Sequence, residues 1–304
     1  MITVLSGGVG AARLLRVLRQ HVEPASLRAV VNVGDDLVMH GLTICPDLDT
    51  ITYTVTGRNN ETLGWGLAGE TWRVRDQLAA LGGEAWFSLG DLDLATHLYR
   101  SQRLAHGATK TEVAAELGAK LGLDIALLPV SDDSVATMFD TEIGPLSFQE
   151  YFVKHHHGVR VEALHFAGAE HASLTPGVVS ALTEAERIII APSNPLISIG
   201  PMLAIPGLRP LLSERRNDVV AVSPIINGAA LKGPADRLLA EQGFAVSCVG
   251  VAQYYQGLIG TLVIDEIDAH LADDVRATGC DVRISPTIMG APESDLALAK
   301  AVLG

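Results

Sequence analysis

The sequence predicts an α/β protein with a Rossmann-like, doubly wound, mostly parallel sheet and an inserted helical lobe. Two observations predict this fold class. Short apolar runs, typical of strands that are buried on both faces of a parallel sheet, recur along the chain. Most of them are followed by a loop rich in glycine, proline or polar residues and then by a segment of helical periodicity, which is the order of a doubly wound sheet.

The individual elements follow from apolar runs bounded by turn-forming residues, and from apolar residues that repeat every three or four positions. Residues 50–56 suit a helix or a strand equally well and stay unassigned. The predicted strands are 2–5, 27–33, 84–89, 125–129, 135–143, 187–191, 219–222, 246–249, 261–264 and 282–284. The helices predicted by range are 63–81, 109–121, 148–157, 235–243 and 294–303; Trp72, Val74 and Leu78 should face inward in the first of these, and Thr111 should cap the second. Three further helices are predicted: one that carries Leu14, Leu15, Val17 and Leu18, one that Asp93 caps, and one that begins at Ala269.

The alternation of strand and helix is weaker in the middle of the chain than at its two ends. We therefore expect residues 1–95 and 176–304 to form a Rossmann-like nucleotide-binding core, and residues 96–175 to form an inserted, mainly helical lobe.

Composition narrows the function classes. The chain has 304 residues, a net charge of −13 and no long basic run, which argues against nucleic acid as a partner. Three widely spaced cysteines without a CxxC motif indicate neither a zinc site nor a disulfide framework. The amino terminus has no basic leader region, and no apolar stretch approaches the roughly 18–20 residues that span a bilayer. We expect a cytoplasmic protein without a membrane partner.

An acidic loop after the second predicted strand is the first candidate site. Four carboxylates, Asp35, Asp36, Asp47 and Asp49, fall within fifteen residues, among Gly34, Gly41 and Pro46. Ligands of open α/β sheets bind beyond the carboxyl ends of the strands, and neighbouring carboxylates need a cation, a shared proton or solvent between them. Mg²⁺, which prefers oxygen ligands, fits such a loop. The alternative is a solvated surface loop with turn-forming residues.

A glycine loop after the first predicted strand is the second candidate. Gly7, Gly8, Val9 and Gly10 join a strand to a helix, and such a loop lets the backbone and the free N–H groups of the helix approach a phosphate. The loop matches neither the G-x-G-x-x-G fingerprint nor a P-loop, and a tight turn without a ligand is the alternative.

Polar loops follow three further predicted strands. Pro192-Ser193-Asn194-Pro195, with Ser198 behind it, offers asparagine donors and acceptors to a base or a ribose. Ser223 and Lys232 follow the next strand, although a lysine there is as often solvated. Asp91, Asp93 and His97 follow the third strand, where Asp93 alone is interpreted as a helix cap and His97 is either a ligand or a packed helix residue. His155-His156-His157 is interpreted as a solvated helix end, because consecutive helix residues point in different directions.

Six motifs, taken together, resemble a known family. In order they are Ser6-Gly7-Gly8-Val9-Gly10, Val31-Asn32-Val33-Gly34-Asp35-Asp36, Cys45-Pro46-Asp47-Leu48-Asp49-Thr50, Ala95-Thr96-His97-Leu98, Ala191-Pro192-Ser193-Asn194-Pro195 and Val222-Ser223-Pro224-Ile225-Ile226. The chain resembles the 2-phospho-L-lactate transferase family of deazaflavin coenzyme F-420 biosynthesis, including its actinobacterial phosphoenolpyruvate-type members. The resemblance runs from residue 3 to about residue 290.

The resemblance implies a Mg²⁺-dependent transfer. A three-carbon acid joined to guanosine diphosphate would be the donor, and the ribityl hydroxyl of the deazaflavin FO would be the acceptor, with GMP released. It implies metal binding by Asp47 with Asp35 or Asp36, of which Asp35 is preferred, and catalysis by Asp49 and Asp47, with Asp49 holding the hydroxyl. A homodimer is also implied. The implied substrate-binding residues are Gly7, Gly8, Val9, Gly10, Asn32, Asp36, Thr50, Ser88, Asp91, Ser193, Asn194, Ser198 and Ser223.

One departure from the family pattern bears on the donor. The chain has Gly90-Asp91-Leu92-Asp93 where the family is expected to carry Gly-Asp-Arg-Asp. Loss of an arginine removes a bidentate contact to a phosphate or carboxylate if that side chain faced the cleft. Two alternatives to the transferase remain: another nucleotide-dependent transferase on the same scaffold, and a non-catalytic nucleotide-binding regulatory protein.

Overall fold

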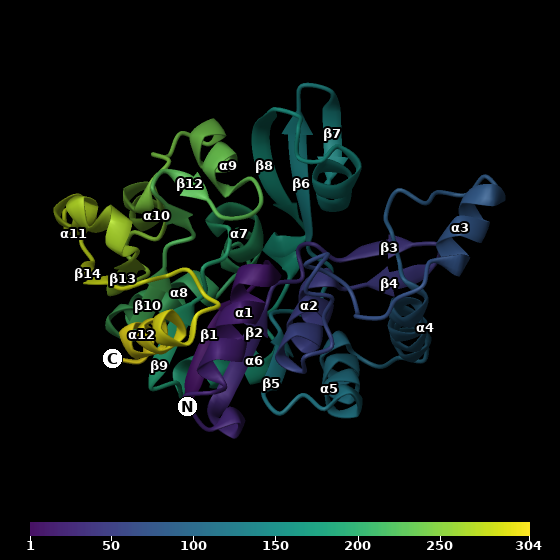
Figure 1. Ribbon diagram of the computed structural model, residues 1–304, viewed down its shortest axis with the longest axis horizontal. Helices are drawn as coiled ribbons and strands as arrows, with labels where there is room; N and C mark the ends of the chain where they lie inside the picture. Colours follow the sequence, from purple (N-terminus) through teal and green to yellow (C-terminus); the bar gives the residue numbers. More distant parts are fainter.

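A seven-stranded parallel sheet forms the centre of the protein, with strand order β14-β13-β10-β9-β1-β2-β5 (Figure 1). The computed structural model describes all residues, 1–304. Every pair of neighbouring strands is parallel, which confirms the predicted fold class. The strands are β1 Ile2–Ser6, β2 Leu27–Val31, β5 Ala126–Pro129, β9 Arg187–Ile190, β10 Val219–Val222, β13 Thr261–Ile264 and β14 Asp281–Ile284.

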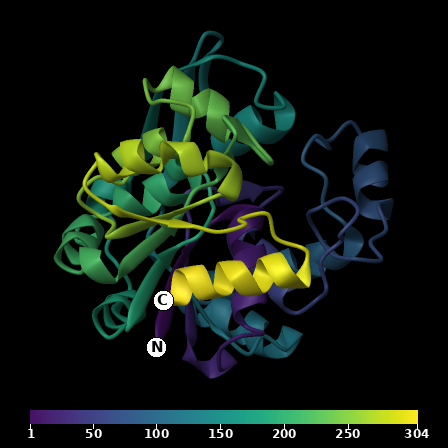
Figure 2. The same cartoon turned by 60° about the vertical axis from the view of Figure 1, so that its left-hand side comes forward.

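Helices cover both faces of this sheet, because successive strand residues point to opposite sides. Val4 of β1 belongs to one hydrophobic core and its neighbour Leu5 to the other. The first core is closed by α1 Gly8–Leu18, α2 Pro46–Val55, α5 Lys110–Leu121 and α12 Pro292–Leu303, and Figure 2 shows α12 lying beside α1. The second is closed by α6 Pro176–Thr183, α7 Gly200–Leu203, α8 Leu208–Glu214, α9 Ala235–Glu241, α10 Cys248–Tyr254 and α11 Ala272–Arg276.

The direction of winding reverses next to β1. The chain first builds β2 and β5 on one side of β1, and then returns to build β9, β10, β13 and β14 on the other side. In doubly wound sheets the loops at such a switch point diverge and leave a crevice beyond the carboxyl ends of the strands. The loops after β1, β2, β9 and β10 therefore border one crevice.

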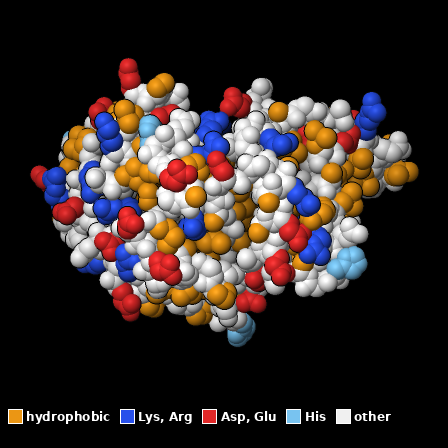
Figure 3. Space-filling view, turned by 90° about the horizontal axis from the view of Figure 1, so that it is seen from below, with side chains coloured by type: hydrophobic (Ala, Val, Ile, Leu, Met, Phe, Trp, Pro, Cys, Tyr) orange, Lys and Arg blue, Asp and Glu red, His pale blue; other side chains and the backbone are white.

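A side lobe projects from the sheet (right of Figure 1). It consists of the hairpin β3 Leu37–Met39 and β4 Leu42–Ile44 with α3 Arg73–Ala80 and α4 Asp91–Ala105. Met39, Ile44 and Leu89 form its small core. In Figure 3 hydrophobic side chains are frequent at the narrow end of the molecule that this lobe forms, and Val74 and Leu81 are exposed there.

The range 96–175 is not the helical lobe that the sequence predicted. Its strand β5 pairs with β2 and belongs to the central sheet. A three-stranded antiparallel sheet, β7-β6-β8, follows as β6 Ala136–Thr141, β7 Gly144–Ser147 and β8 Val161–Ala167, with a π-helical turn Glu150–Lys154 between the last two. Strand β8 was not predicted, because only one of its seven residues, Val161, is buried and the sequence there shows no apolar run.

Several predicted elements differ in the structure. Residues 84–89 form no strand, because Trp86 and Phe87 pack against the side-lobe core without a strand partner. The helix expected over 63–81 is confined to α3, and Val74, expected inward, is 52% exposed. Residues 246–249 form no strand, since α10 begins at Cys248. The unassigned segment 50–56 belongs mostly to helix α2.

Helix α5 begins one residue earlier than its predicted cap. The side chain of Thr109, not Thr111, accepts the N–H of Glu112, and the Glu112 side chain accepts the N–H of Thr109 in a capping box. Two further short hairpin strands, β11 Ile225–Ile226 and β12 Ala229–Ala230, follow β10. All three cysteines are buried and free. By length and composition no single helix could cross a membrane, whereas one bent helix pair, Pro195–Leu203 with Leu208–Glu214, meets those two criteria.

Candidate active site

A cavity of about 740 Å³ lies in the crevice at the carboxyl ends of the strands. Its volume is in the range of pockets that hold small-molecule ligands. The glycine loop, the start of α2 and the loops after β9, β10 and β14 form one side, and α4 and the side lobe form the other. The sequence-predicted residues that line it are Gly7, Gly8, Val9, Gly10, Asp35, Asp47, Asp49, Thr50, Ser88, Ser193, Asn194, Ser198 and Ser223.

Asp47 connects the glycine loop to the end of β2. Its Oδ1 accepts the backbone N–H of Gly8 at 2.7 Å, and its Oδ2 accepts the Asn32 amide at 3.0 Å. The Asn32 Oδ1 in turn accepts the N–H of Gly34. Asn32, expected to bind a ligand, does not line the cavity; it orients Asp47.

At Gly7 and Gly10 the glycine loop lies so close to the loop after β9 that a side chain would collide with it. A Cβ at Gly10 would lie 2.2 Å from the carbonyl oxygen of Pro192, and one at Gly7 would lie 2.8 Å from Cβ of Ser198. Ser193 donates to the carbonyl of Gly7 at 2.7 Å. The loop after β9 is thus packed onto the glycine loop, and α1 begins at the cavity wall, where its first N–H groups lack intrahelical partners and favour an anion.

Asp35 and Asp47 form a buried acidic pair. Both are less than a tenth exposed. Burial, only partly offset by the hydrogen bonds from Asn32 and Gly8, raises the pKa of Asp47 to about 6. Burial and the neighbouring Asp47 carboxylate raise the pKa of Asp35 well above its usual value. Asp35 Oδ1 has no hydrogen-bond partner. A buried, unsatisfied carboxylate beside a second one suits a divalent cation with oxygen ligands, so these residues fit Mg²⁺.

Asp36 differs from its neighbour Asp35. Its Oδ2 lies 2.7 Å from Nζ of Lys110 on α5, and both side chains are largely buried. Asp36 does not line the cavity. Asp35 therefore lies at the cleft, whereas Asp36, predicted to bind substrate, forms an internal ion pair with Lys110.

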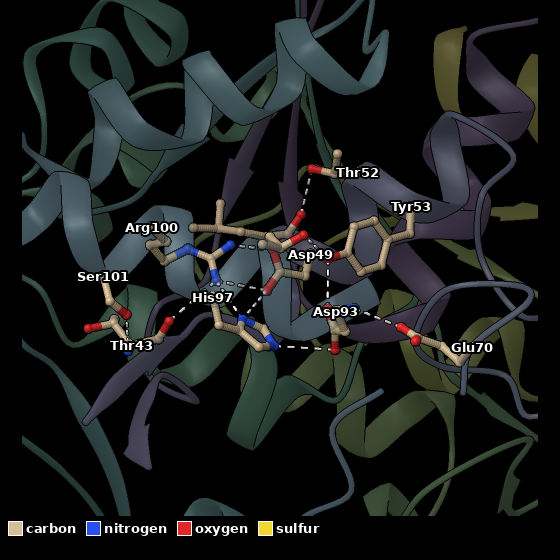
Figure 4. Close-up of polar contacts among 11 residues, drawn as sticks. Thr43, Asp49, Thr52, Tyr53, Glu70, Asp93, His97, Arg100 and Ser101 are labelled. Carbon is tan, nitrogen blue, oxygen red and sulfur yellow. Dashed lines mark hydrogen bonds and ion pairs between the residues drawn. The ribbon is translucent and has the colours of Figure 1, made fainter. Parts of the chain in front are cut away.

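Asp49 is held by Arg100, a residue that the sequence did not single out. The two guanidinium nitrogens Nη1 and Nη2 donate to Asp49 Oδ2 and Oδ1, the former at 3.0 Å. Arg100 lies on α4, fifty-one positions away, and Figure 4 shows the two side chains facing each other. The spacing is too long for a sequence signal, because only the packing of α4 against α2 brings the pair together.

A second acid and a histidine continue this network. His97 Nε2 lies 3.3 Å from Asp93 Oδ2, and Arg100 Nη1 lies 3.1 Å from His97 Nδ1 (Figure 4). Since arginine can only donate, Nδ1 acts as the acceptor and Nε2 carries the proton. Tyr53 donates to Asp93 Oδ1 at 2.7 Å. Burial alone would raise the pKa of Asp93, but the hydrogen bonds from His97 and Tyr53, together with the charge of Arg100, outweigh it and lower that pKa.

By spacing alone, Asp49, Asp93 and His97 could hold a metal ion, since one ligand atom of each lies within 4.8 Å of the others. The guanidinium of Arg100, however, takes both oxygens of Asp49 and faces His97. The cationic position in this cluster is therefore filled by a side chain. The candidate metal site is the pair Asp35 and Asp47.

Asp91 has a structural role in place of the predicted binding role. Its carboxylate accepts the hydroxyl of Thr71 and the backbone N–H groups of Arg73 and Val74 at the start of α3. Glu70, which precedes α3, accepts the backbone N–H groups of Leu92 and Asp93 at the start of α4 in the same way. Asp91 does not line the cavity, so the two acids cap each other's helices.

Leu92, which replaces the expected arginine, is 52% exposed and does not line the cavity. In this structure its side chain points to solvent at the first turn of α4. Leu92 itself therefore makes no contact inside the cleft.

Several cleft residues were not predicted. Arg13 of α1 lines the cavity without an ion-pair partner. The predicted residue Asn194 lines it as well, and its buried amide nitrogen has no acceptor. His156 and His157, interpreted as a solvated helix end, also line it, with φ of +50° and +42°. Aromatic side chains from the side lobe and the π-helical turn complete the wall: Trp65, Trp86, Phe87, Phe148 and Phe152.

The fold and the cleft define a class of α/β enzyme whose crevice offers a glycine loop and buried acids to a phosphate-bearing ligand. The family model described as 2-phospho-L-lactate transferase CofD matches residues 2–285, and the chain belongs to this family. It is 41% identical to the phosphoenolpyruvate transferase of Streptomyces griseus over 99% of this chain and 97% of that protein. It is 39% identical to the phosphoenolpyruvate transferase of Mycolicibacterium smegmatis, again over 99% and 97%.

A more distant relative carries a different name. The 2-phospho-L-lactate transferase of Methanosarcina acetivorans is 37% identical, over 99% of this chain and 97% of that protein. Among solved structures, protein BH3568 of Bacillus halodurans has a TM-score of 0.65, with 17% identity over 100% of this chain and 99% of that chain. At that identity the likeness shows the fold alone.

Proposed function

We propose that this protein transfers a phospho-three-carbon-acid group from a guanosine diphosphate donor to the ribityl hydroxyl of FO, with Mg²⁺ and release of GMP, in coenzyme F-420 biosynthesis. The observation that carries the proposal is the cleft. It places a glycine loop at a helix start, the buried pair Asp35 and Asp47, and the carboxylate Asp49 along one cavity. The names of the relatives, phosphoenolpyruvate transferase and 2-phospho-L-lactate transferase, support the reaction class.

The donor diphosphate is assigned to the glycine loop. The N–H groups of Val9 and Gly10 lie in the first turn of α1, where they are free to donate to phosphate oxygens. Asp35 and Asp47 would hold Mg²⁺, which when bound neutralises diphosphate charge and stabilises the leaving GMP. Asn194, with its unpartnered amide, and Ser223 offer polar groups to the nucleoside.

The acceptor is assigned to the opposite side of the cleft. The aromatic wall suits a planar deazaflavin, since aromatic rings pack favourably against one another. Asp49 accepts the hydrogen bond of the attacking hydroxyl and takes its proton as the new bond forms. In that step the hydroxyl oxygen bonds to the phosphorus that carries the three-carbon acid. The phosphoanhydride bond breaks, and its electron pair leaves with GMP.

The test is a reconstituted reaction. Purified protein is mixed with FO, MgCl₂, GTP, a guanylyltransferase that forms the donor in place, and 2-phospho-L-lactate, phosphoenolpyruvate or 3-phosphoglycerate. Mass spectrometry then measures the phospho-acid ester of FO and GMP. We expect an ester with at least one acid, and its loss in Asp49→Asn.

The outcomes separate the alternatives. An ester identifies both the reaction and the three-carbon acid. Binding of GMP or FO without an ester from any acid would refute the transferase and favour the regulatory nucleotide-binding protein. GMP release without an FO ester would favour a transferase that uses another acceptor.

A further inference from the structure

Both oxygens of the Asp49 carboxylate accept hydrogen bonds from a buried arginine. Arg100 donates to both of its oxygens through separate guanidinium nitrogens, and the Arg100 side chain is only 3% exposed. The Asp49 side chain keeps 11% exposure, and the residue lines the cavity. Asp49 thus turns one edge to a buried cation and the other to the cleft.

Arg100 is itself held in place. Besides Asp49, its Nη1 contacts His97 Nδ1 at 3.1 Å, and His97 is fixed through Nε2 by Asp93 (Figure 4). A planar guanidinium presents its donors as a rigid fork that matches a carboxylate, whereas a lysine ammonium is a single point of charge. The pair therefore fixes both the position of the Asp49 carboxylate and its rotation.

We propose that Arg100 is a positioning residue for the acceptor hydroxyl: it sets the orientation in which Asp49 receives that hydroxyl. The inference rests on the proposed function. Transfer of a phosphoryl group through a loose transition state depends mostly on alignment, and the proton leaves late. A misplacement of about 1 Å can cost about a hundredfold in rate.

The experiment compares Arg100→Lys, Arg100→Gln, Asp49→Asn and the double variant Asp49→Asn/Arg100→Gln, all in the reconstituted reaction. Each single neutral variant leaves a buried unpaired charge and should lower Tm, whereas the double variant removes both charges and should recover most of the Tm. Arg103→Lys is the matched control. Arg103 lies on the same helix and forms a bidentate pair with Glu116, but this pair is partly exposed and does not line the cavity.

We expect Arg100→Lys to fold and to lower kcat by about 10- to 100-fold, with KM for the guanosine donor within about twofold. The double variant should recover stability but not kcat, while Arg103→Lys keeps wild-type kcat. Wild-type kcat in Arg100→Gln, measured below its lowered Tm, would overturn the proposal, because Arg100 would then be needed only for folding. Full activity of Arg100→Lys would overturn it as well.

The wild-type reaction separates this inference from the proposed function. If wild-type protein yields no FO ester, the function fails, and the role of Arg100 fails with it. If wild-type protein yields the ester and Arg100→Lys turns over at the same rate, only the role of Arg100 is refuted.

Discussion

Asp47 Oδ1 accepts the backbone N–H of Gly8 at 2.7 Å, so an acid in the first turn of α2 closes on the first residue of α1. The contact spans thirty-nine positions and joins the two loops that the sequence selected separately. Asp47 therefore contacts the glycine loop and neighbours Asp35, so under the proposed function the phosphates and the cation would meet at this place.

Asp35 and Asp36 should respond differently to neutralisation. Asp35→Asn removes a buried charge that faces Asp47, so we expect a higher Tm without metal at pH 8, no Mg²⁺-dependent rise in Tm, and kcat/KM lower by about 100-fold or more. Asp36→Asn breaks the ion pair with Lys110, so Tm should fall while the Mg²⁺ response persists. Differential scanning fluorimetry with and without MgCl₂ measures both. Equal Mg²⁺ responses in the two variants would contradict the assignment of Asp35.

The acidic pair predicts a pH dependence of stability. The pKa of Asp47 is raised to about 6, above the value of about 4 for an unfolded aspartate. Between these values the folded protein binds more protons than the unfolded one, so the free energy of unfolding falls as pH rises. We expect a loss of about 1 to 3 kcal/mol between pH 4 and pH 7 from this group in EDTA.

Mg²⁺ should reverse this trend, because the metal and the proton compete for the same carboxylates. Its apparent affinity should rise from pH 5 to pH 7, by up to about tenfold per pH unit for each proton displaced. Isothermal titration calorimetry at several pH values measures it. A Mg²⁺ affinity that is independent of pH over this range would contradict the site.

Gly10→Ala should disrupt the cleft. The added Cβ would meet the Pro192 carbonyl at 2.2 Å, so the loop after β9 must move, at a cost of about 2 kcal/mol or more. Gly41→Ala is the control, since Gly41 has φ +75° and open space around it, and only backbone strain of about 1 kcal/mol is expected. Urea unfolding measures both costs. GMP binding should weaken in Gly10→Ala but not in Gly41→Ala. Unchanged GMP binding in Gly10→Ala would contradict the assignment of the glycine loop to the nucleotide.

Asp91→Ala tests the structural role of that acid. Loss of the cap should loosen the start of α3, and we expect faster proteolysis or hydrogen exchange over residues 70–80. Glu70→Ala should have the matching effect on the start of α4. GMP binding and the Mg²⁺ response should persist in Asp91→Ala. If GMP binding were lost while α3 stayed protected, Asp91 would be a ligand-binding residue after all.

The central sheet could be predicted because buried parallel strands are continuous apolar runs. Residues 187–191 and 219–222 were found in this way, and they form β9 and β10. The same criterion failed at 84–89, where Trp86 and Phe87 fill a side-lobe core without pairing to a strand. An apolar run in the sequence indicates that a segment is buried, but it does not indicate which other element packs against that segment.

By itself the sequence determined the sheet, the loops at its carboxyl edge and the candidate acids Asp35, Asp47 and Asp49, because strand, loop and helix signals are local. Only the tertiary structure decided how those acids are used. It paired Asp36 with Lys110, committed Asp91 to a helix cap and brought Arg100 to Asp49. Such pairings depend on how helices and loops pack against one another and not on local sequence, because side-chain charges interact strongly only where packing places them within a few ångströms.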